Sequence, residues 1–274
     1  MGVLTIDESK CKKDRICARE CPSRIIELEN GGYPQIPSWA ETSCTACGHC
    51  VAVCPHGALS HTQVPVGDCT AIDEKLVIDA QRAEQFLRSR RSIRLYEDRP
   101  VEKEKIQKLI EISRYAPTAV NSQSVQWLVV TDKALLKETA RITAEWFRKF
   151  LNDEPRVAAA APHLVLTVKN WDSGHDSVLR GAPVLVVASA PKEASNGMVD
   201  LTLALCYMTL MAPTMGLGSC WAGLVQRSLL TVPSLKEMLG VPAAHPHHYP
   251  VMLGYTKAKY YRLPERKPPK ITFK

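Results

Sequence analysis

A cluster of cysteines near the N-terminus constrains the fold of this chain more than any other feature of its sequence. Seven of its ten cysteines lie at positions 11, 17, 21, 44, 47, 50 and 54. Residues 44–55 read CTACGHCVAVCP, and this C-x2-C-x2-C-x3-C-P spacing places thiolates around an iron–sulfur cluster. Because so short a region has little apolar core, bound metal must supply much of its stability. The sequence therefore predicts a small metal-dependent domain.

The first cysteine run departs from this spacing at one position. Residues 11–22 read CKKDRICARECP, so Asp14 occupies the place of the second ligand. A carboxylate oxygen is a harder donor than a thiolate and suits iron less well, so we expect the Asp14 corner to be the labile one. Two alternatives stay open. Either Asp14 completes a 4Fe-4S cluster, or it faces solvent and the site holds a 3Fe-4S cluster.

Zinc is the competing interpretation of the cysteines. Zinc ribbons pair two C-x2-C hooks across a longer loop, whereas four cysteines here fall within eleven residues ahead of a proline. Over residues 5–62 the two runs resemble a two-cluster bacterial ferredoxin. The crossed connectivity of that family implies two ligand sets, which are Cys11, Asp14, Cys17 and Cys54 for one cluster and Cys21, Cys44, Cys47 and Cys50 for the other.

Composition and charge narrow the class of protein. With 45% hydrophobic and 23% charged residues and no visible export signal, the chain is expected to be cytoplasmic, with reduced or metal-bound cysteines. The richest apolar stretch, 198–213, carries Asp200 and is shorter than a bilayer span, so no membrane association is expected. Beyond residue 63, 29 Lys and Arg face 21 Asp and Glu. This excess favours an acidic protein partner over nucleic acid, because no nucleic-acid recognition motif accompanies it.

The pattern of apolar residues predicts a second, larger domain. We expect a ferredoxin domain over 1–63, a linker over 64–78 and an α+β domain over 79–274. Helices are predicted from an N-cap at Asp79, over 102–115 and over 198–216. Buried strands are predicted at 127–131, 163–168 and 183–189.

Arginines surround a serine directly after the first of these helices, in the sequence RRSIR at 90–94. Guanidinium forks and a hydroxyl donor suit a phosphate group. The segments APTAVNSQ (116–123), GLGSCWAGL (216–224) and GYTKAKYYRLPERKP (254–268) follow in that order. This succession resembles the nitroreductase family of FMN enzymes over 82–274. With the N-terminal domain, the chain is similar to the ferredoxin-fused branch of that family.

The resemblance implies an FMN site in which the flavin N5 is the reacting centre and no side chain acts as a catalyst. The residues that it assigns to the FMN phosphate and ribityl chain are Arg90, Arg91, Ser92, Arg94 and Arg266. The residues that would reach the flavin from the other subunit of a homodimer are Pro117, Thr118 and Asn121. Backbone groups at Ala222 and Gly223 would lie beside the ring, where small residues permit close approach.

Together these features predict an iron–sulfur flavoprotein oxidoreductase. An acidic low-potential donor such as a ferredoxin or flavodoxin would reduce the clusters, and single electrons would pass to FMN. The expected acceptor is a small organic molecule: a nitroaromatic, quinone, activated alkene or flavin. Two alternatives stay open: an NAD(P)H-dependent nitroreductase whose clusters carry electrons out, and a redox or iron sensor without turnover.

Overall fold

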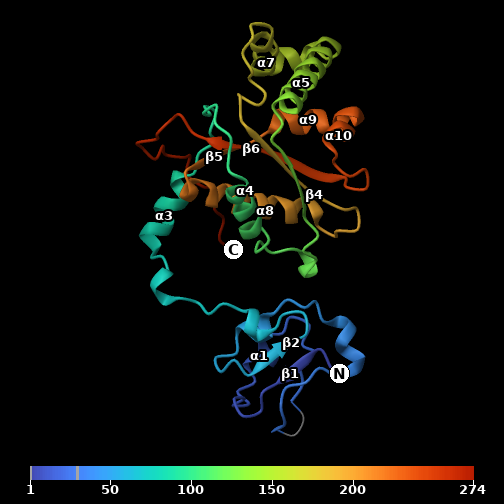
Figure 1. Ribbon diagram of the computed structural model, residues 1–274, viewed down its shortest axis with the longest axis vertical. Helices are drawn as coiled ribbons and strands as arrows, with labels where there is room; N and C mark the ends of the chain where they lie inside the picture. The colour runs from blue at the N-terminus through green and yellow to red at the C-terminus, as the bar shows by residue number, and fades with distance from the viewer. Residues whose placement is uncertain (1, 29–30) are drawn as a thin grey trace. The chain divides into compact units, whose positions relative to one another are not determined.

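The computed structural model describes residues 2–28 and 31–274 and divides the chain into two compact units (Figure 1). The first unit runs to Ile78 and includes Val120–Ser122. The second unit comprises Asp79–Ala119 and Gln123–Lys274. Residues 64–78, for which a linker was predicted, therefore group with the cysteine-rich unit.

The first unit has short elements joined by loops. They are β1 (Leu4–Ile6), α1 (Ile16–Glu20), η2 (Ser38–Ser43), α2 (His49–Ala52), β2 (Leu59–His61), η3 (Val66–Asp68) and η4 (Glu74–Leu76). Strands β1 and β2 pair antiparallel, with Leu4 opposite His61. The buried core consists of Cys17, Ile26, Val51 and Leu59. Four residues are a small core, so the unit has little apolar burial to stabilise it without metal.

The second unit is built on a four-stranded antiparallel sheet. In spatial order its strands are β3 (Gln126–Val130), β4 (Val184–Ala190), β6 (His247–Tyr255) and β5 (Leu217–Trp221). All seven residues of β4 are buried. Alternate residues of β4 enter two different apolar clusters, because successive side chains of a strand point to opposite faces of the sheet.

Helices cover both faces of this sheet (Figure 1). One face carries α4 (Lys103–Ser113) and α8 (Gly197–Met211), which pack on each other and on the strands. The other face carries α5 (Lys133–Asp153), α9 (Gly223–Thr231) and α10 (Pro233–Leu239). The remaining elements are α3 (Ala80–Ser89), α6 (Pro155–Ala160), α7 (Pro162–Asp172), η5 (Ala119–Asn121) and η6 (Ala212–Met215). The unit is therefore an α+β domain, as the sequence predicted.

One predicted strand is wrong. Residues 163–168, HLVLTV, lie in helix α7, which begins at Pro162 and packs against α5. The buried residues are Leu164, Thr167 and Val168, whose spacing of three and four is helical. Proline also suits the first turn of a helix, because N–H groups in that turn have no hydrogen-bond partner within the helix. The helix with Asp79 as its N-cap is confirmed, and the carboxylate accepts a hydrogen bond from the Arg82 amide at 2.8 Å.

Helix α8 is apolar nearly all round. Leu201, Leu205 and Met208 are buried against the sheet, whereas Val199 and Tyr207 are exposed. In the described part of the chain, Gly197–Met215 is the one helical segment long and apolar enough to cross a membrane by composition, with a mean hydropathy of 1.4. It is longer than the apolar stretch that the sequence suggested, because 3-10 helix η6 continues α8 through Pro213. The core helix of a soluble protein passes the same test.

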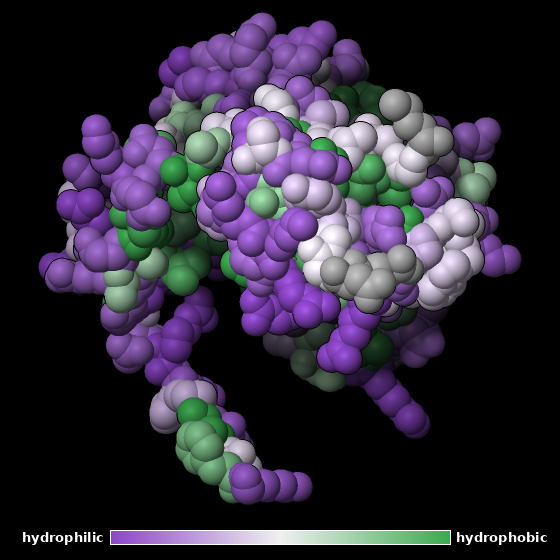
Figure 2. Space-filling view, turned by 90° about the horizontal axis from the view of Figure 1, so that it is seen from below, coloured by the Kyte–Doolittle hydropathy of each residue, from purple (hydrophilic) through white to green (hydrophobic). Residues whose placement is uncertain are grey.

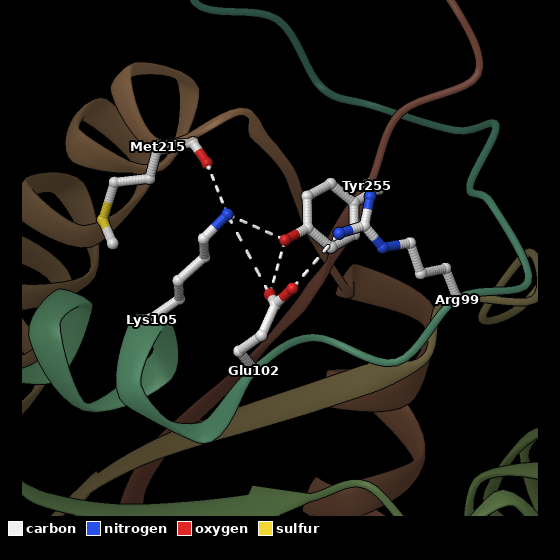
Figure 3. A network of polar contacts seen from close by, with 5 residues as sticks. All are labelled: Arg99, Glu102, Lys105, Met215 and Tyr255. Carbon is white, nitrogen blue, oxygen red and sulfur yellow. Dashed lines mark hydrogen bonds and ion pairs between the residues drawn. The ribbon is translucent and has the colours of Figure 1, made fainter.

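A polar network fixes the end of β6 to the start of α4 (Figure 3). The Tyr255 hydroxyl accepts a hydrogen bond from Lys105 Nζ at 2.8 Å and donates one to a carboxylate oxygen of Glu102. Lys105 Nζ also reaches the Met215 carbonyl at 3.3 Å, and Arg99 donates to Glu102 at 3.2 Å. The hydrogen bond from Tyr255 lowers the pKa of Glu102 to about 2. The network therefore fixes the sheet end from which the basic tail departs.

The surface is mainly hydrophilic on the face that Figure 2 shows, with hydrophobic residues in smaller areas. Several large apolar side chains are exposed in the segment before α3, in α3 itself and in the C-terminal tail. They include Ile72, Leu76, Val77, Leu87, Ile271 and Phe273. Of the described residues, none in α3 itself is buried.

Candidate redox cofactor sites

Two cavities in the first unit gather the eight candidate iron ligands into two separate groups. The donors that line the first cavity, called site one below, are Cys11, Asp14, Cys17 and Cys54. The donors that line the second cavity, called site two, are Cys21, Cys44, Cys47 and Cys50. These are the two sets that the crossed connectivity of ferredoxins implies.

The arrangement of these donors fits an iron–sulfur cluster better than a single metal ion. Among the described residues, no group of three or more His, Cys, Asp or Glu side chains converges to hold one ion. Each set of four instead surrounds a space with mostly apolar walls, as a cluster with its own sulfides requires.

Unusual backbone conformations shape both cluster loops. Lys13 and Arg15, on either side of Asp14, have φ values of 58° and 66°. Ala46 and Gly48, on either side of Cys47, have φ values of 50° and 74°. A residue other than glycine in this left-handed region carries strain, and such strain persists where the surroundings hold it. The loops thus turn sharply at the candidate ligands.

The Asp14 carboxylate has two polar contacts. Its Oδ1 accepts a hydrogen bond from the Ile16 amide at 3.1 Å, and its Oδ2 lies 3.7 Å from His56 Nε2. Lys12, Lys13 and Arg15 also line site one. The Asp14 corner is therefore partly exposed and lies among basic side chains.

Burial makes two of the cysteine thiols weaker acids, because it raises their pKa. Desolvation raises the pKa of Cys50 to about 11, and it also raises the pKa of Cys17. A ligand must be deprotonated to bind iron, so cluster assembly has to displace these protons. Metal binding is thus coupled to proton release and to folding of the first unit.

Hydrogen bonds reach cysteine sulfurs in both sites, and backbone amides at Ala18 and Val51 supply one each, to Cys17 and Cys50. In site one the Ala58 amide lies 3.4 Å from Cys54 Sγ. In site two the imidazole of His61 places Nε2 3.5 Å from Cys44 Sγ. His61 is only 4% exposed, and burial lowers its pKa, which keeps the ring neutral. Its other nitrogen, Nδ1, accepts a hydrogen bond from the Gln63 amide at 3.0 Å.

In the second unit, the segment that carries the candidate phosphate ligands lies beside β5. Ser92 forms a bridge with Ser219, and the Ile93 amide donates to the Ser219 carbonyl at 2.9 Å. A Cβ atom on Gly218 would lie 2.4 Å from Ile93 Cγ1. Only glycine permits this close approach, which fixes the segment 90–94 against the sheet. Arg94 is exposed, and Arg90 and Arg91 are partly buried.

The basic tail returns to the same segment. Glu265 Oε2 lies 3.3 Å from Arg88 Nη2, and the Arg91 guanidinium lies 5.9 Å from the ring centre of Tyr260. Arg266 is exposed next to Glu265. The structure thus brings the tail close to the arginines of RRSIR, although the two segments lie far apart in sequence.

The loop after α4 has an irregular backbone. Val120, Asn121 and Gln123 have φ values of 48°, 55° and 47°. Thr118 Oγ1 accepts the Gln123 amide at 3.0 Å. Pro117 is exposed. Left-handed conformations at three residues, one of them β-branched, are a mark of functional loops.

Side chains on both sides of this loop hold it. Within the second unit, Asp200 Oδ1 accepts the Ala119 amide at 3.0 Å. Within the first unit, the Asn121 amide donates to the carbonyl oxygens of Thr45 and Ala46 at 3.0 and 3.1 Å. The side chain of Asn121 is therefore engaged with the backbone of the site two loop.

Ala222 and Gly223 lie where β5 ends and α9 begins. The Ala222 amide donates to the Pro250 carbonyl at 2.9 Å, so it is already used in the sheet. Gly223 starts α9, where the first amides have no partner inside the helix. A Cβ on Gly223 would approach the Tyr249 hydroxyl at 3.4 Å. The Gly223 amide is thus better suited to a flavin than the Ala222 amide.

Sequence reasoning missed His56, His61 and Asp200. His56 follows the last cysteine run, and its place in CPH is the one signal that pointed to site one. His61 lies in β2, seventeen residues from Cys44, and no spacing rule predicts that contact. The sequence shows Asp200 as a charged residue in an apolar helix. Its hydrogen bond with the Ala119 amide depends on the fold and has no signal in the sequence.

A sequence model of the nitroreductase family matches residues 87–255, and one of a 4Fe-4S dicluster domain matches residues 9–59. The chain belongs to the nitroreductase family. It carries an N-terminal ferredoxin-like 4Fe-4S domain and is an FMN-dependent oxidoreductase by family.

Individual relatives support the same assignment. The chain is 29% identical over 177 residues to an Archaeoglobus fulgidus protein named NADH dehydrogenase/NAD(P)H nitroreductase, covering 63% of this chain and 84% of that one. It is 30% identical over 148 residues to the Bacillus subtilis FMN reductase [NAD(P)H], covering 51% and 53%. The crystal structure of a Bacteroides fragilis nitroreductase with bound FMN matches with a TM-score of 0.55 and 23% identity, covering 69% and 97%. That structural likeness shows the fold.

Proposed function

We propose that this chain relays single electrons from a low-potential donor through two iron–sulfur clusters to FMN, for the reduction of a small organic acceptor. The observation that carries the proposal is the division of the eight donors of the first unit around two cavities, in a chain whose second unit belongs to a family of flavin enzymes. When bound, the clusters supply one-electron transfer and FMN couples it to reduction of the acceptor.

Residues of the second unit fit an FMN phosphate. Arg90 and Arg91 follow α3 directly, and the contact between Arg88 and Glu265 holds Arg266 in the same region. We assign the FMN phosphate and ribityl chain to these arginines with Ser92 and Arg94. The fixed strand position of Ser92 and the amide of Gly223 would orient the ring against β5. The cationic groups would hold the phosphate through charge-assisted hydrogen bonds.

A second copy of the chain would complete this site. Helix α8 leaves Val199 55% and Tyr207 40% exposed, although the helix is apolar nearly all round. Burying such side chains in a symmetric interface is favourable by about 25 cal/mol for each Å² of apolar surface. We infer a homodimer in which Pro117, Thr118 and Asn121 approach the flavin of the partner subunit, and Asn121 would give up its hydrogen bonds to Thr45 and Ala46 to do so. The irregular loop that carries them is consistent with this role.

NAD(P)H as the electron source is the second candidate, because both named relatives carry NAD(P)H in their names. In that case the nicotinamide would reduce the flavin directly, and the clusters would carry electrons out. Anaerobic stopped-flow mixing separates the two. Reduced ferredoxin or flavodoxin should bleach the flavin in the wild-type protein and fail to do so in a Cys47→Ala variant. If NADH or NADPH bleaches the flavin faster, and equally in both proteins, the relay is not the main route.

A further inference from the structure

The hydrogen bonds of the buried His61 ring decide which of its nitrogens carries the proton. Nδ1 lies 3.0 Å from the backbone nitrogen of Gln63, which can only donate, so Nδ1 must be the acceptor. A neutral imidazole whose Nδ1 accepts a hydrogen bond carries its proton on Nε2. Nε2 is the atom 3.5 Å from Cys44 Sγ. The imidazole therefore donates an N–H to this sulfur.

The ring is held firmly in this position. His61 ends β2, where it is paired with Leu4, and its backbone amide and carbonyl both bond to Val64. The cavity wall beside it is apolar and includes Ile25, Ile26 and Ile36. In surroundings of low polarity a hydrogen bond to a charged group is stronger than in water.

We propose that His61 raises the reduction potential of the cluster at site two by donating its Nε2–H to the Cys44 sulfur. This inference rests on the proposed function, because it requires a 4Fe-4S cluster on the four cysteines of site two. Reduction adds one negative charge to a cluster and its sulfurs, so a donor to sulfur stabilises the reduced form more than the oxidised form. His61 acts through Cys44 and is a positioning residue.

Site one has no side chain in this role among the described contacts. Its sulfur hydrogen bonds come from backbone amides, from Ala58 to Cys54 at 3.4 Å and from Ala18 to Cys17. His61 therefore adds a side-chain control of the potential to site two that site one lacks among the described contacts. A substitution can remove this control without changing any candidate ligand.

The test is an anaerobic redox titration of the full-length protein, followed by EPR of the reduced clusters. His61→Leu should lower one of the two midpoint potentials, with about a tenfold change in the ratio of oxidised to reduced cluster, which is about 59 mV for a one-electron couple. His61→Gln should retain most of the wild-type potential, because its side-chain amide can donate from near the Nε2 position. His49→Leu is the matched control. His49 lines the same cavity but bonds to Glu20, so both midpoints should stay unchanged.

Two results would overturn the role of His61. One is an unchanged midpoint in His61→Leu protein that keeps its iron, and the other is His61→Gln lowering the midpoint as far as His61→Leu does. Should His61→Leu lose its iron, pulsed EPR of His49→Leu protein with nitrogen-15 histidine decides the question. Coupling of a histidine nitrogen and an exchangeable proton to the reduced site two cluster supports the hydrogen bond, and its absence refutes it. A wild-type protein with no reduced-cluster signal would instead refute the proposed function itself.

Discussion

Site one and site two are built from similar loops but differ in what surrounds them. Site one has three cysteines and Asp14, with Lys12, Lys13, Arg15 and His56 at its wall. Site two has four cysteines, no Lys or Arg among its described lining residues, and a buried histidine bonded to a sulfur. If the proposed clusters are bound, the exposed and basic wall of site one would favour loss of iron and contact with an acidic partner, and the histidine of site two would raise the reduction potential of its cluster.

The largest loss of iron and of stability is expected when a cysteine ligand is removed from site two. Cys47→Ala should lose about half of the cluster iron and destabilise the first unit, because bound metal supplies much of its folding free energy. Iron and sulfide analysis, with circular dichroism of the unfolding transition, measures both effects. Cys69→Ala is the control, since Cys69 is exposed and outside both cavities. Full iron content in Cys47→Ala would break the assignment of site two.

Removing the carboxylate of site one should have a smaller effect. Asp14→Ala should lose about one iron atom per chain and show a three-iron EPR signal, because the three cysteines still hold the rest of the cluster. Asp14→Cys should give a complete cluster that resists oxidation better than the wild type. If Asp14→Ala keeps all its iron and its reduced spectrum, Asp14 is not a ligand.

Charge reversal at the wall of site one tests the route of electron entry. Lys12→Glu with Arg15→Glu should slow reduction by an acidic ferredoxin about tenfold at low salt, and the difference should shrink as salt screens the charges. Stopped-flow absorbance under anaerobic conditions gives the rates. Lys108→Glu with Lys149→Glu, at two exposed positions on helices of the second unit, makes the same change in total charge and is the control. Equal slowing by the control would mean that site one is not the docking point.

Substitution of His56 is expected to have the smallest effect, a change in the rate of iron loss from site one. Its contact with Asp14 is long, at 3.7 Å, and both side chains are about a third exposed. Exposed ion pairs contribute little, so His56→Gln should change the rate of iron loss from site one by no more than about fivefold. Chelator-induced bleaching of oxidised protein measures this rate. A change as large as that of Asp14→Ala would make His56 a ligand in its own right.

The sequence predicted the parts of the molecule that depend on spacing. Cysteine runs and the order of RRSIR, APTAVNSQ and GLGSCWAGL are local patterns, and they identified both domains and the family. The ligand and FMN-binding roles of single residues stay predictions. The split of Cys54 from its neighbours Cys47 and Cys50 came from the ferredoxin resemblance, and the cavities show the same split.

Contacts between distant segments could not be predicted from the sequence. His61 meets Cys44 because β1 and β2 pair, and Asp200 meets the Ala119 amide because α8 packs beside α4. The strand prediction for residues 163–168 was wrong for a different reason. A short apolar stretch fits a strand or a helix equally well, and packing against α5 settles which one forms.

The most direct test of the central claim is iron, sulfide and FMN analysis with EPR on anaerobically purified protein, before and after dithionite. Two clusters and a bound flavin predict about eight iron atoms and about one FMN per chain, with reduced-cluster signals from both sites. A three-iron signal before reduction would show that site one has lost, or never held, the iron at Asp14. Protein that binds FMN but contains no iron, or zinc in its place, would contradict the account.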